Sequence, residues 1–290
     1  PHTTRRKRTA VKASGSARWR ALATIPLVAA LLLPTAPAFA GEVSAPAETT
    51  TNPVSTALDT GSLPDPLDRG PYTPATIQET KLGLVDLQEP NSSGLAPDPG
   101  TARAPETMEI RGALYSPADR TEPSPVIVLV HGNHGSCDVN GDTSVLSCDE
   151  FKRNEAGYAY LGENLASWGY TVFSVSQDQL MMRQDGTSGK GMHQRRLMIA
   201  ATLDALTAAN EPGGLPVDEH TTIGEALAGK LDMERIGLMG HSRGGDAVTS
   251  FIDYNRIRTD GPRYPLRGVI ALAPVDYERK APYGTPFLSI

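Results

Sequence analysis

The hexapeptide Gly240-His241-Ser242-Arg243-Gly244-Gly245 contains the residues best suited to covalent chemistry. It matches the pattern Gly-x-Ser-x-Gly, which forms a sharp turn between a strand and a helix and exposes the serine hydroxyl. Glycine is needed at positions 240 and 244 because a Cβ there would collide with neighbouring backbone as the chain reverses. Ser242 is therefore the candidate nucleophile. The N–H of Arg243, at the start of the expected helix, is a candidate donor to an oxyanion.

The elements that would position this turn follow from the apolar pattern. Residues 126–130 are five consecutive apolar residues, four of them β-branched, which is typical of a strand buried on both faces of a parallel sheet. Strand and helix patterns alternate along the chain, which predicts an α/β fold with a mostly parallel sheet and flanking helices. Further strands are predicted at residues 108–115, 170–175, 235–239 and 268–273, helices at 159–168, 197–209 and 244–254, and the start of another strand at 287–290.

A second motif, His131-Gly132-Asn133-His134-Gly135, directly follows the buried strand 126–130. With this loop after one strand and the Ser242 turn after a later one, the chain from about residue 107 to 290 resembles the α/β-hydrolase family. Members of that family carry a His-Gly loop after the third strand and the serine turn after the fifth. The resemblance implies that the backbone N–H of Asn133 or His134 joins that of Arg243 in an oxyanion hole, with Gly132 allowing close approach to the substrate.

The same resemblance implies residues that this sequence lacks. In the family the catalytic acid follows the seventh strand and the histidine follows the eighth, in the order Ser, Asp or Glu, His. All six histidines of this chain precede Ser242, and no acid after Ser242 stands at the family's position. We therefore expect residues 106–290 to be the N-terminal two-thirds of a hydrolase domain. The acid and the histidine would then lie beyond Ile290, and the chain alone would hydrolyse esters poorly.

The resemblance favours a serine hydrolase that cleaves carboxylic esters, small or lipid-like, without a cofactor. The alternative is a non-catalytic extracellular binding protein that keeps the turn only as structure. The sequence does not identify the substrate. Metal binding is disfavoured, because His131 and His134 lack a third ligand in sequence and the calcium-like segment 138–149 lacks its required glycine. Arg243 either orients an anionic group of the substrate or makes a surface ion pair.

The charge balance argues against nucleic acid as a partner. The chain has 290 residues, 27 Lys and Arg and 33 Asp and Glu, for a net charge of −6. Seven of the basic residues and none of the acidic ones lie in residues 1–40, so the remaining chain has a net charge of −13. Such a body repels phosphate backbones and anionic lipid.

Residues 1–40 have the layout of a secretory signal peptide. A basic stretch leads into a short apolar run and the small-residue site Ala38-Phe39-Ala40. The run is shorter than the roughly 20 residues that span a membrane, so no stable span is expected in the mature, secreted protein. Export by the general or the twin-arginine route remains open. Residues 41–105 are rich in Pro, Ser and Thr and predict a linker or extended arm, with a possible short edge strand at residues 82–87.

The two cysteines, Cys137 and Cys148, lie eleven residues apart. In an exported protein this pair predicts a disulfide that closes one loop; two buried free thiols are the alternative.

Overall fold

The computed structural model describes residues 65, 67–87, 107–142, 147–182 and 191–290. The predicted signal peptide, and the predicted linker apart from residues 65 and 67–87, lie outside these ranges. No helix in the described ranges is long and apolar enough to cross a membrane.

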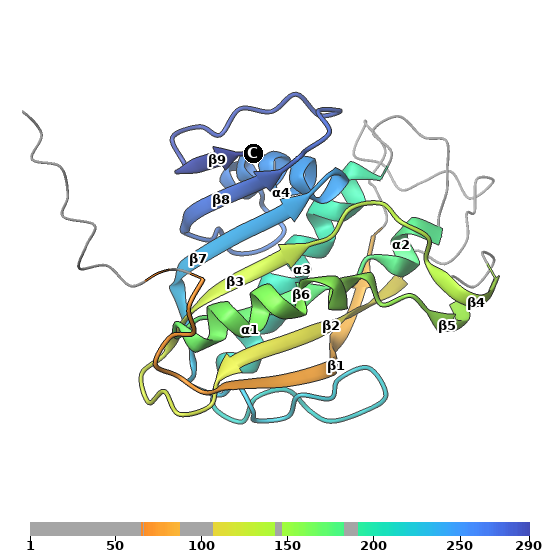
Figure 1. Cartoon of the computed structure of the whole chain (residues 1–290). Helices are drawn as coiled ribbons and strands as arrows, with labels where there is room; N and C mark the ends of the chain where they lie inside the picture. The colour runs from red at the N-terminus through yellow and green to blue at the C-terminus, as the bar shows by residue number, and fades with distance from the viewer. Residues whose placement is uncertain (1–64, 66, 88–106, 143–146, 183–190) are drawn as a thin grey trace, which may run out of the picture. The chain divides into compact units, whose positions relative to one another are not determined.

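The described residues build a seven-stranded, mostly parallel sheet (Figure 1). Its strands, in spatial order, are β1 (Pro74–Asp86), β2 (Thr107–Pro117), β6 (Thr171–Val175), β3 (Ser124–Val130), β7 (Leu231–His241), β8 (Leu266–Leu272) and β9 (Phe287–Ser289). The pairs β1–β2 and β2–β6 are antiparallel, and the remaining pairs are parallel. Counted in chain order, β3 is the third strand of this sheet and β7 the fifth. The two motifs therefore follow the strands that the family resemblance implies.

Helices cover the sheet on two faces (Figure 1). On one face lies α1 (Ala159–Ser167), preceded by the short 3-10 helix η3 (Asn154–Tyr158). On the other face lie α3 (Met192–Asn210) and α4 (Arg243–Ile257), which pack against each other. The predicted helices are thus present, although α3 begins five residues earlier than its apolar spacing indicated.

The central strand β3 separates two hydrophobic cores. Val126, Val128 and Val130 are buried in the larger core, which also contains the apolar side chains of α3 and α4. Leu129 points to the opposite face and joins the smaller core beside α1. This alternation explains why residues 126–130 include no polar side chain: both faces of the strand are covered there.

The edge strand β1 is longer than the sequence indicated. Only residues 82–87 looked like a strand, yet pairing with β2 extends from Pro74 to Asp86. The segment before β1 also contacts α1, because Gly70 N–H donates to Ser167 Oγ at 2.8 Å. Residues 74–86 therefore belong to the folded sheet, within the segment that composition assigned to a linker or extended arm.

The cysteine-containing segment forms a hairpin of its own. Strand β4 (Cys137–Asp142) pairs antiparallel with β5 (Ser147–Phe151), and Cys137 is disulfide-bonded to Cys148. The predicted disulfide is present, and it closes a hairpin where the sequence indicated only a loop. This hairpin immediately follows the His131–Gly135 loop.

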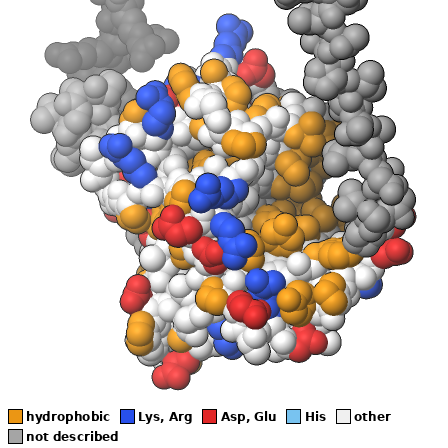
Figure 2. Space-filling view, turned by 90° about the vertical axis from the view of Figure 1, so that its left-hand side faces the viewer, with side chains coloured by type: hydrophobic (Ala, Val, Ile, Leu, Met, Phe, Trp, Pro, Cys, Tyr) orange, Lys and Arg blue, Asp and Glu red, His pale blue; other side chains and the backbone are white. Residues whose placement is uncertain are grey.

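A hollow of about 410 Å³ lies at the N-terminal ends of the parallel strands. Figure 2 looks onto this side of the molecule and shows hydrophobic side chains gathered among charged ones. The lining of the hollow includes Val126, Ile127, Tyr170 and Ile236. Because Ser242 follows the C-terminal end of β7, this hollow is at the opposite edge of the sheet from the candidate nucleophile.

Candidate active site

Ser242 occupies the sharp turn between β7 and α4. Its backbone angles, φ 53° and ψ −118°, fall where non-glycine residues are rare and strained. The turn is held to the next strand, because Ser242 N–H donates to the carbonyl of Leu272 at 3.0 Å. This conformation is what the Gly-x-Ser-x-Gly pattern predicts.

The glycines around Ser242 are required by close backbone contacts. A Cβ at Gly240 would overlap the carbonyl oxygen of Gly244, and a Cβ at Gly244 would overlap the carbonyl oxygen of Val130. Gly245 packs against Pro274, where a Cβ would lie 2.9 Å from the Pro274 Cβ. The sharp turn at Ser242 therefore fits between β3 and the segment after β8 only because Gly240, Gly244 and Gly245 lack side chains.

The His131–Gly135 loop lies directly against Ser242. A Cβ at Gly132 would lie 3.0 Å from the Cβ of Ser242 and 2.9 Å from Nδ1 of His241. A side chain at Gly132 would therefore press on Ser242. The structure brings together the two motifs, which are about 110 residues apart in the sequence.

The three predicted oxyanion donors are in different hydrogen-bonding states. The N–H of His134 already donates to the thioether Sδ of Met181 at 3.1 Å. Among the described residues, the N–H groups of Asn133 and Arg243 make no such bond. The side chains of these two residues are joined, because Arg243 Nη1 donates to Asn133 Oδ1 at 2.8 Å. This geometry favours Asn133 over His134 as the partner of Arg243.

His131 is buried beneath the loop, with 3% of its surface exposed. Its Nε2 accepts a hydrogen bond from the N–H of Gln177 at 2.8 Å, so the ring proton resides on Nδ1, which donates to the carbonyl of Gly132 at 2.8 Å. Burial lowers the pKa of His131 to about 3. Both ring nitrogens of this neutral histidine are used to hold the loop, which leaves none to act as a base.

Arg195, on α3, is a buried cation below the same loop. It is 1% exposed, and its Nη1 donates to the carbonyl of His131 at 3.4 Å and to Oε1 of Gln177. Its Nε has no hydrogen-bond partner, and among the described residues no carboxylate forms an ion pair with it. Burial and, secondarily, the charge of Arg243 lower the pKa of Arg195 to about 9. Nothing in the sequence marked this arginine, which precedes the predicted helix 197–209 and lies in α3 only because that helix begins at Met192.

Two further histidines border Ser242. The rings of His134 and His241 are nearly parallel, 10° apart, with centroids separated by 5.9 Å. Neither ring is hydrogen-bonded to the hydroxyl of Ser242, and no such bond is made by any other described residue. The described part of the chain thus contains a candidate nucleophile and candidate oxyanion donors without a paired general base.

Two buried carboxylates near the site accept hydrogen bonds from neighbouring segments, and Oδ1 of one of them, Asp178, lies 3.8 Å from Nε2 of His131. Asp246, one turn after Ser242 on α4, accepts hydrogen bonds from the N–H groups of Tyr277 and Glu278 at 2.8 and 3.3 Å. Asp178 opens the short helix α2 (Asp178–Met182) and accepts from Asn154 Nδ2 at 2.7 Å. Burial raises the pKa of both carboxyl groups.

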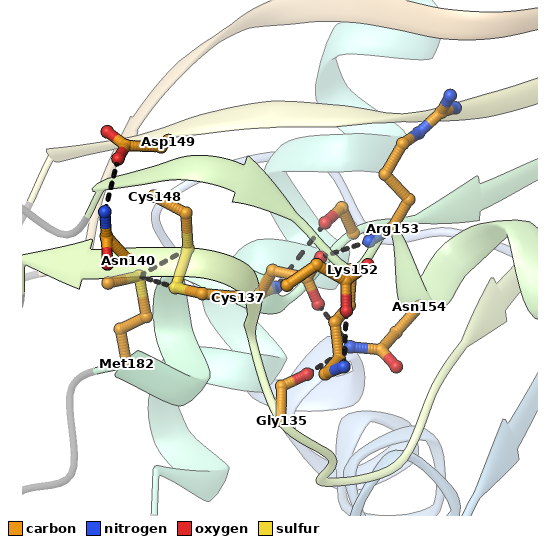
Figure 3. The surroundings of a disulfide bond; sticks show 12 residues. Gly135, Cys137, Asn140, Cys148, Asp149, Lys152, Arg153, Asn154 and Met182 are labelled. Atoms are coloured by element: carbon orange, nitrogen blue, oxygen red, sulfur yellow. Dashed lines mark hydrogen bonds and ion pairs between the residues drawn. A yellow bond between two sulfur atoms is a disulfide. The ribbon is translucent and has the colours of Figure 1, made fainter.

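The disulfide hairpin is connected to the loop through α2. Met182 Sδ lies 3.7 Å from the sulfur of Cys148 and 4.0 Å from that of Cys137 (Figure 3). Met181, next to it in α2, carries the sulfur that accepts the His134 N–H. Asn154, which follows the hairpin, donates to the carbonyl of Gly135 at 2.9 Å. The hairpin and α2 therefore hold the His131–Gly135 loop through Asn154 and Met181.

The candidate metal positions are engaged in other contacts. In the calcium-like segment, Asp138 pairs with Lys152 at 2.5 Å, and Asn140 donates to Asp149 at 2.9 Å. Within the described ranges, no cluster of three or more His, Cys, Asp or Glu side chains could hold a metal ion.

Comparison with known proteins gives one informative relative. No family model matches the chain. Over 243 residues the chain is 24% identical to a protein of Streptomyces coelicolor named bis(hydroxyethyl) terephthalate hydrolase. The aligned region covers 83% of this chain and 58% of the relative, so the chain spans little more than half of that protein's length.

Proposed function

We propose that this chain belongs to a secreted serine hydrolase of the α/β-hydrolase type, which cleaves carboxylic esters through an acyl-enzyme on Ser242. The observation that carries the proposal is the strained turn at Ser242 pressed against the Gly132 loop. A structural turn has no need of that conformation beside a loop with unused backbone donors. The relative in Streptomyces coelicolor, named as a hydrolase of an aromatic ester, supports the same reaction class.

In the proposed reaction, Ser242 Oγ attacks the ester carbonyl, and the N–H groups of Asn133 and Arg243 stabilise the tetrahedral oxyanion. The C–O bond to the alcohol then breaks, and the alcohol leaves with the proton taken from Ser242. Water attacks the acyl-enzyme in the same way, releasing the acid and restoring the serine. In comparable sites each oxyanion donor lowers the barrier by about 3–4 kcal/mol.

The general base is proposed to be a histidine that follows Ile290, oriented by an Asp or Glu that also follows it. One observation supports this proposal: Ser242 Oγ has no histidine partner among the described residues. The chain of 290 residues is accordingly expected to turn over esters poorly by itself.

Secretion is proposed from the signal-like residues 1–40, and the Cys137–Cys148 disulfide is compatible with an oxidising compartment.

A fluorophosphonate probe tests the mechanism on the full-length protein. Labelling should occur on the wild type and be lost in Ser242→Ala. It should persist in Ser147→Ala, because Ser147 is an exposed serine of the hairpin strand β5. Equal labelling of the wild type and Ser242→Ala would refute the nucleophile. No labelling of either would favour a non-catalytic binding protein.

A further inference from the structure

Arg243, adjacent to the nucleophile, is a cation without an anionic partner. Its guanidinium is held by Asn133 Oδ1 at 2.8 Å and lies 6.0 Å from the centroid of the Tyr277 ring. No ion pair joins it to a carboxylate in the part of the chain that the structure describes. Of the two roles that the sequence left open for this arginine, the surface ion pair is absent from the described residues.

The neighbouring carboxylates are engaged in other interactions. Asp246 accepts the N–H groups of the loop after β8, and Glu278 of that loop is paired with Arg196 at 2.9 Å. Asp178 is buried with Asn154 beyond the oxyanion loop. Asp276, on the loop after β8, is exposed and makes no ion pair with Arg243. The positive charge at Arg243 is therefore not neutralised by an ion pair with any of these four acids.

A second uncompensated cation reinforces this charge. Arg195 lies beneath the oxyanion loop without a carboxylate partner in the described ranges, and Arg243 repels it. Like charges held together in a partly desolvated site cost free energy unless an anion binds there. Asn133 fixes the Arg243 guanidinium through one nitrogen, Nη1, which leaves its other N–H donors for a ligand.

We infer that the Ser242 site selects esters that carry a second, anionic group, and that the guanidinium of Arg243 binds this group. The substrate class is the half-ester of a dicarboxylic acid: Ser242 attacks the ester carbonyl while the distant carboxylate pairs with Arg243. Planar, charge-assisted pairing of this kind is the usual use of arginine in carboxylate recognition. The inference rests on the proposed function of Ser242.

Matched esters provide the test on the full-length protein. The substrates are the monomethyl and dimethyl esters of succinate, glutarate and adipate, which differ within each pair only in the distant charge. Arg243→Gln should lower kcat/KM for the best monomethyl ester by about tenfold or more, mainly through KM, as expected for the loss of a charge-assisted contact. For the matching dimethyl ester the loss should be at least about threefold smaller, because that ester loses only the support that the Arg243 side chain gives to Asn133. Arg243→Lys should keep part of the preference, because the charge remains without the planar geometry.

Arg235→Gln is the charge-matched control. Arg235, in the first half of β7, lines the hollow at the opposite edge of the sheet from Ser242, so this variant makes the same change in net charge away from Ser242 and should preserve the preference. An equal loss for both esters in Arg243→Gln would make Arg243 only a support for Asn133 and would overturn the inference. No loss for either ester would overturn it as well.

A binding measurement separates this inference from the proposed mechanism. Calorimetric titration of Ser242→Ala with monomethyl and dimethyl succinate requires no turnover. Tighter binding of the monomethyl ester, lost in Ser242→Ala/Arg243→Gln, would support the anion site even if Ser242 proved not to be a nucleophile. Equal binding of the two esters, or binding of neither, would refute the anion site, whereas Ser242-dependent hydrolysis of both would leave the proposed function standing.

Discussion

The backbone N–H of His134 donates to the sulfur of Met181 at 3.1 Å. The contact joins the His131–Gly135 loop to α2. The other methionine of α2, Met182, contacts the Cys137–Cys148 disulfide. A thioether is a weak acceptor, but it satisfies an N–H that would otherwise be unpaired at the edge of the site. The loop is therefore fixed through the His134 N–H, while the Asn133 N–H has no hydrogen-bond partner among the described residues.

Replacing Met181 tests this support. Met181→Leu preserves volume but removes the acceptor, so the free energy of unfolding should fall by about 0.5–1.5 kcal/mol. Hydrogen exchange at the His134 amide should become faster. Urea unfolding and exchange mass spectrometry measure the two effects. Met182→Leu is the matched control, because within the described ranges its sulfur contacts the two disulfide sulfurs and not the His134 amide. The control should leave exchange at His134 unchanged, and the same exchange rate in both variants would contradict the assignment.

A side chain at Gly244 should displace the sharp turn that contains Ser242. In Gly244→Ala the new Cβ would overlap the carbonyl oxygen of Val130 in the central strand, and neither backbone can yield without disturbing the sheet. We expect the free energy of unfolding to fall by at least about 2 kcal/mol. In Gly268→Ala, within β8, the Cβ would meet no atom within 4 Å, and stability should change little. Equal stabilities of the two variants would argue against the tight contact.

The sequence predicted those parts of the fold that depend on local pattern. Residues 126–130 predicted a buried strand because every side chain is apolar. The glycines around Ser242 predicted the sharp turn because only glycine fits there. The full length of β1 was missed. Its first half contains Gln78 and Glu79, both exposed at the sheet edge, and thus lacks the apolar alternation of a half-buried strand.

The missed parts of the site depend on contacts between distant residues. Arg195 and Gln177 are 18 residues apart, and each is polar, so their type predicted exposure rather than a buried pair. The hairpin of β4 and β5 has few apolar side chains and is closed by the disulfide. The sequence therefore predicted a disulfide-closed loop there and not a pair of strands. Arg195 and Gln177 come together only through the three-dimensional packing around His131.

Removing the disulfide should destabilise the hairpin and, through α2, the His131–Gly135 loop. For a cross-link with a sequence separation of 11 residues, the chain-entropy model gives a loss of about 3 kcal/mol in the double variant Cys137→Ser/Cys148→Ser. Hydrogen exchange should rise over residues 137–151 and, less strongly, at residues 131–135. A thiol titration of the denatured, unreduced wild type should find no free sulfhydryl. Two free sulfhydryls would contradict the disulfide.

His131 should remain neutral across the range in which histidines normally titrate. Its pKa is lowered by burial to about 3, so the neutral form favours the folded state. This contribution to stability is complete above the unfolded pKa of about 6.5 and is lost as the pH falls toward 3. ¹⁵N NMR of the ring should show one neutral tautomer, protonated on Nδ1, from pH 4 to 8. The stability difference between the wild type and His131→Asn should shrink on acidification from about pH 6.5. A ring that titrates near pH 6.5 in the folded protein would show that His131 is solvated, and the buried network with Gln177 would then be wrong.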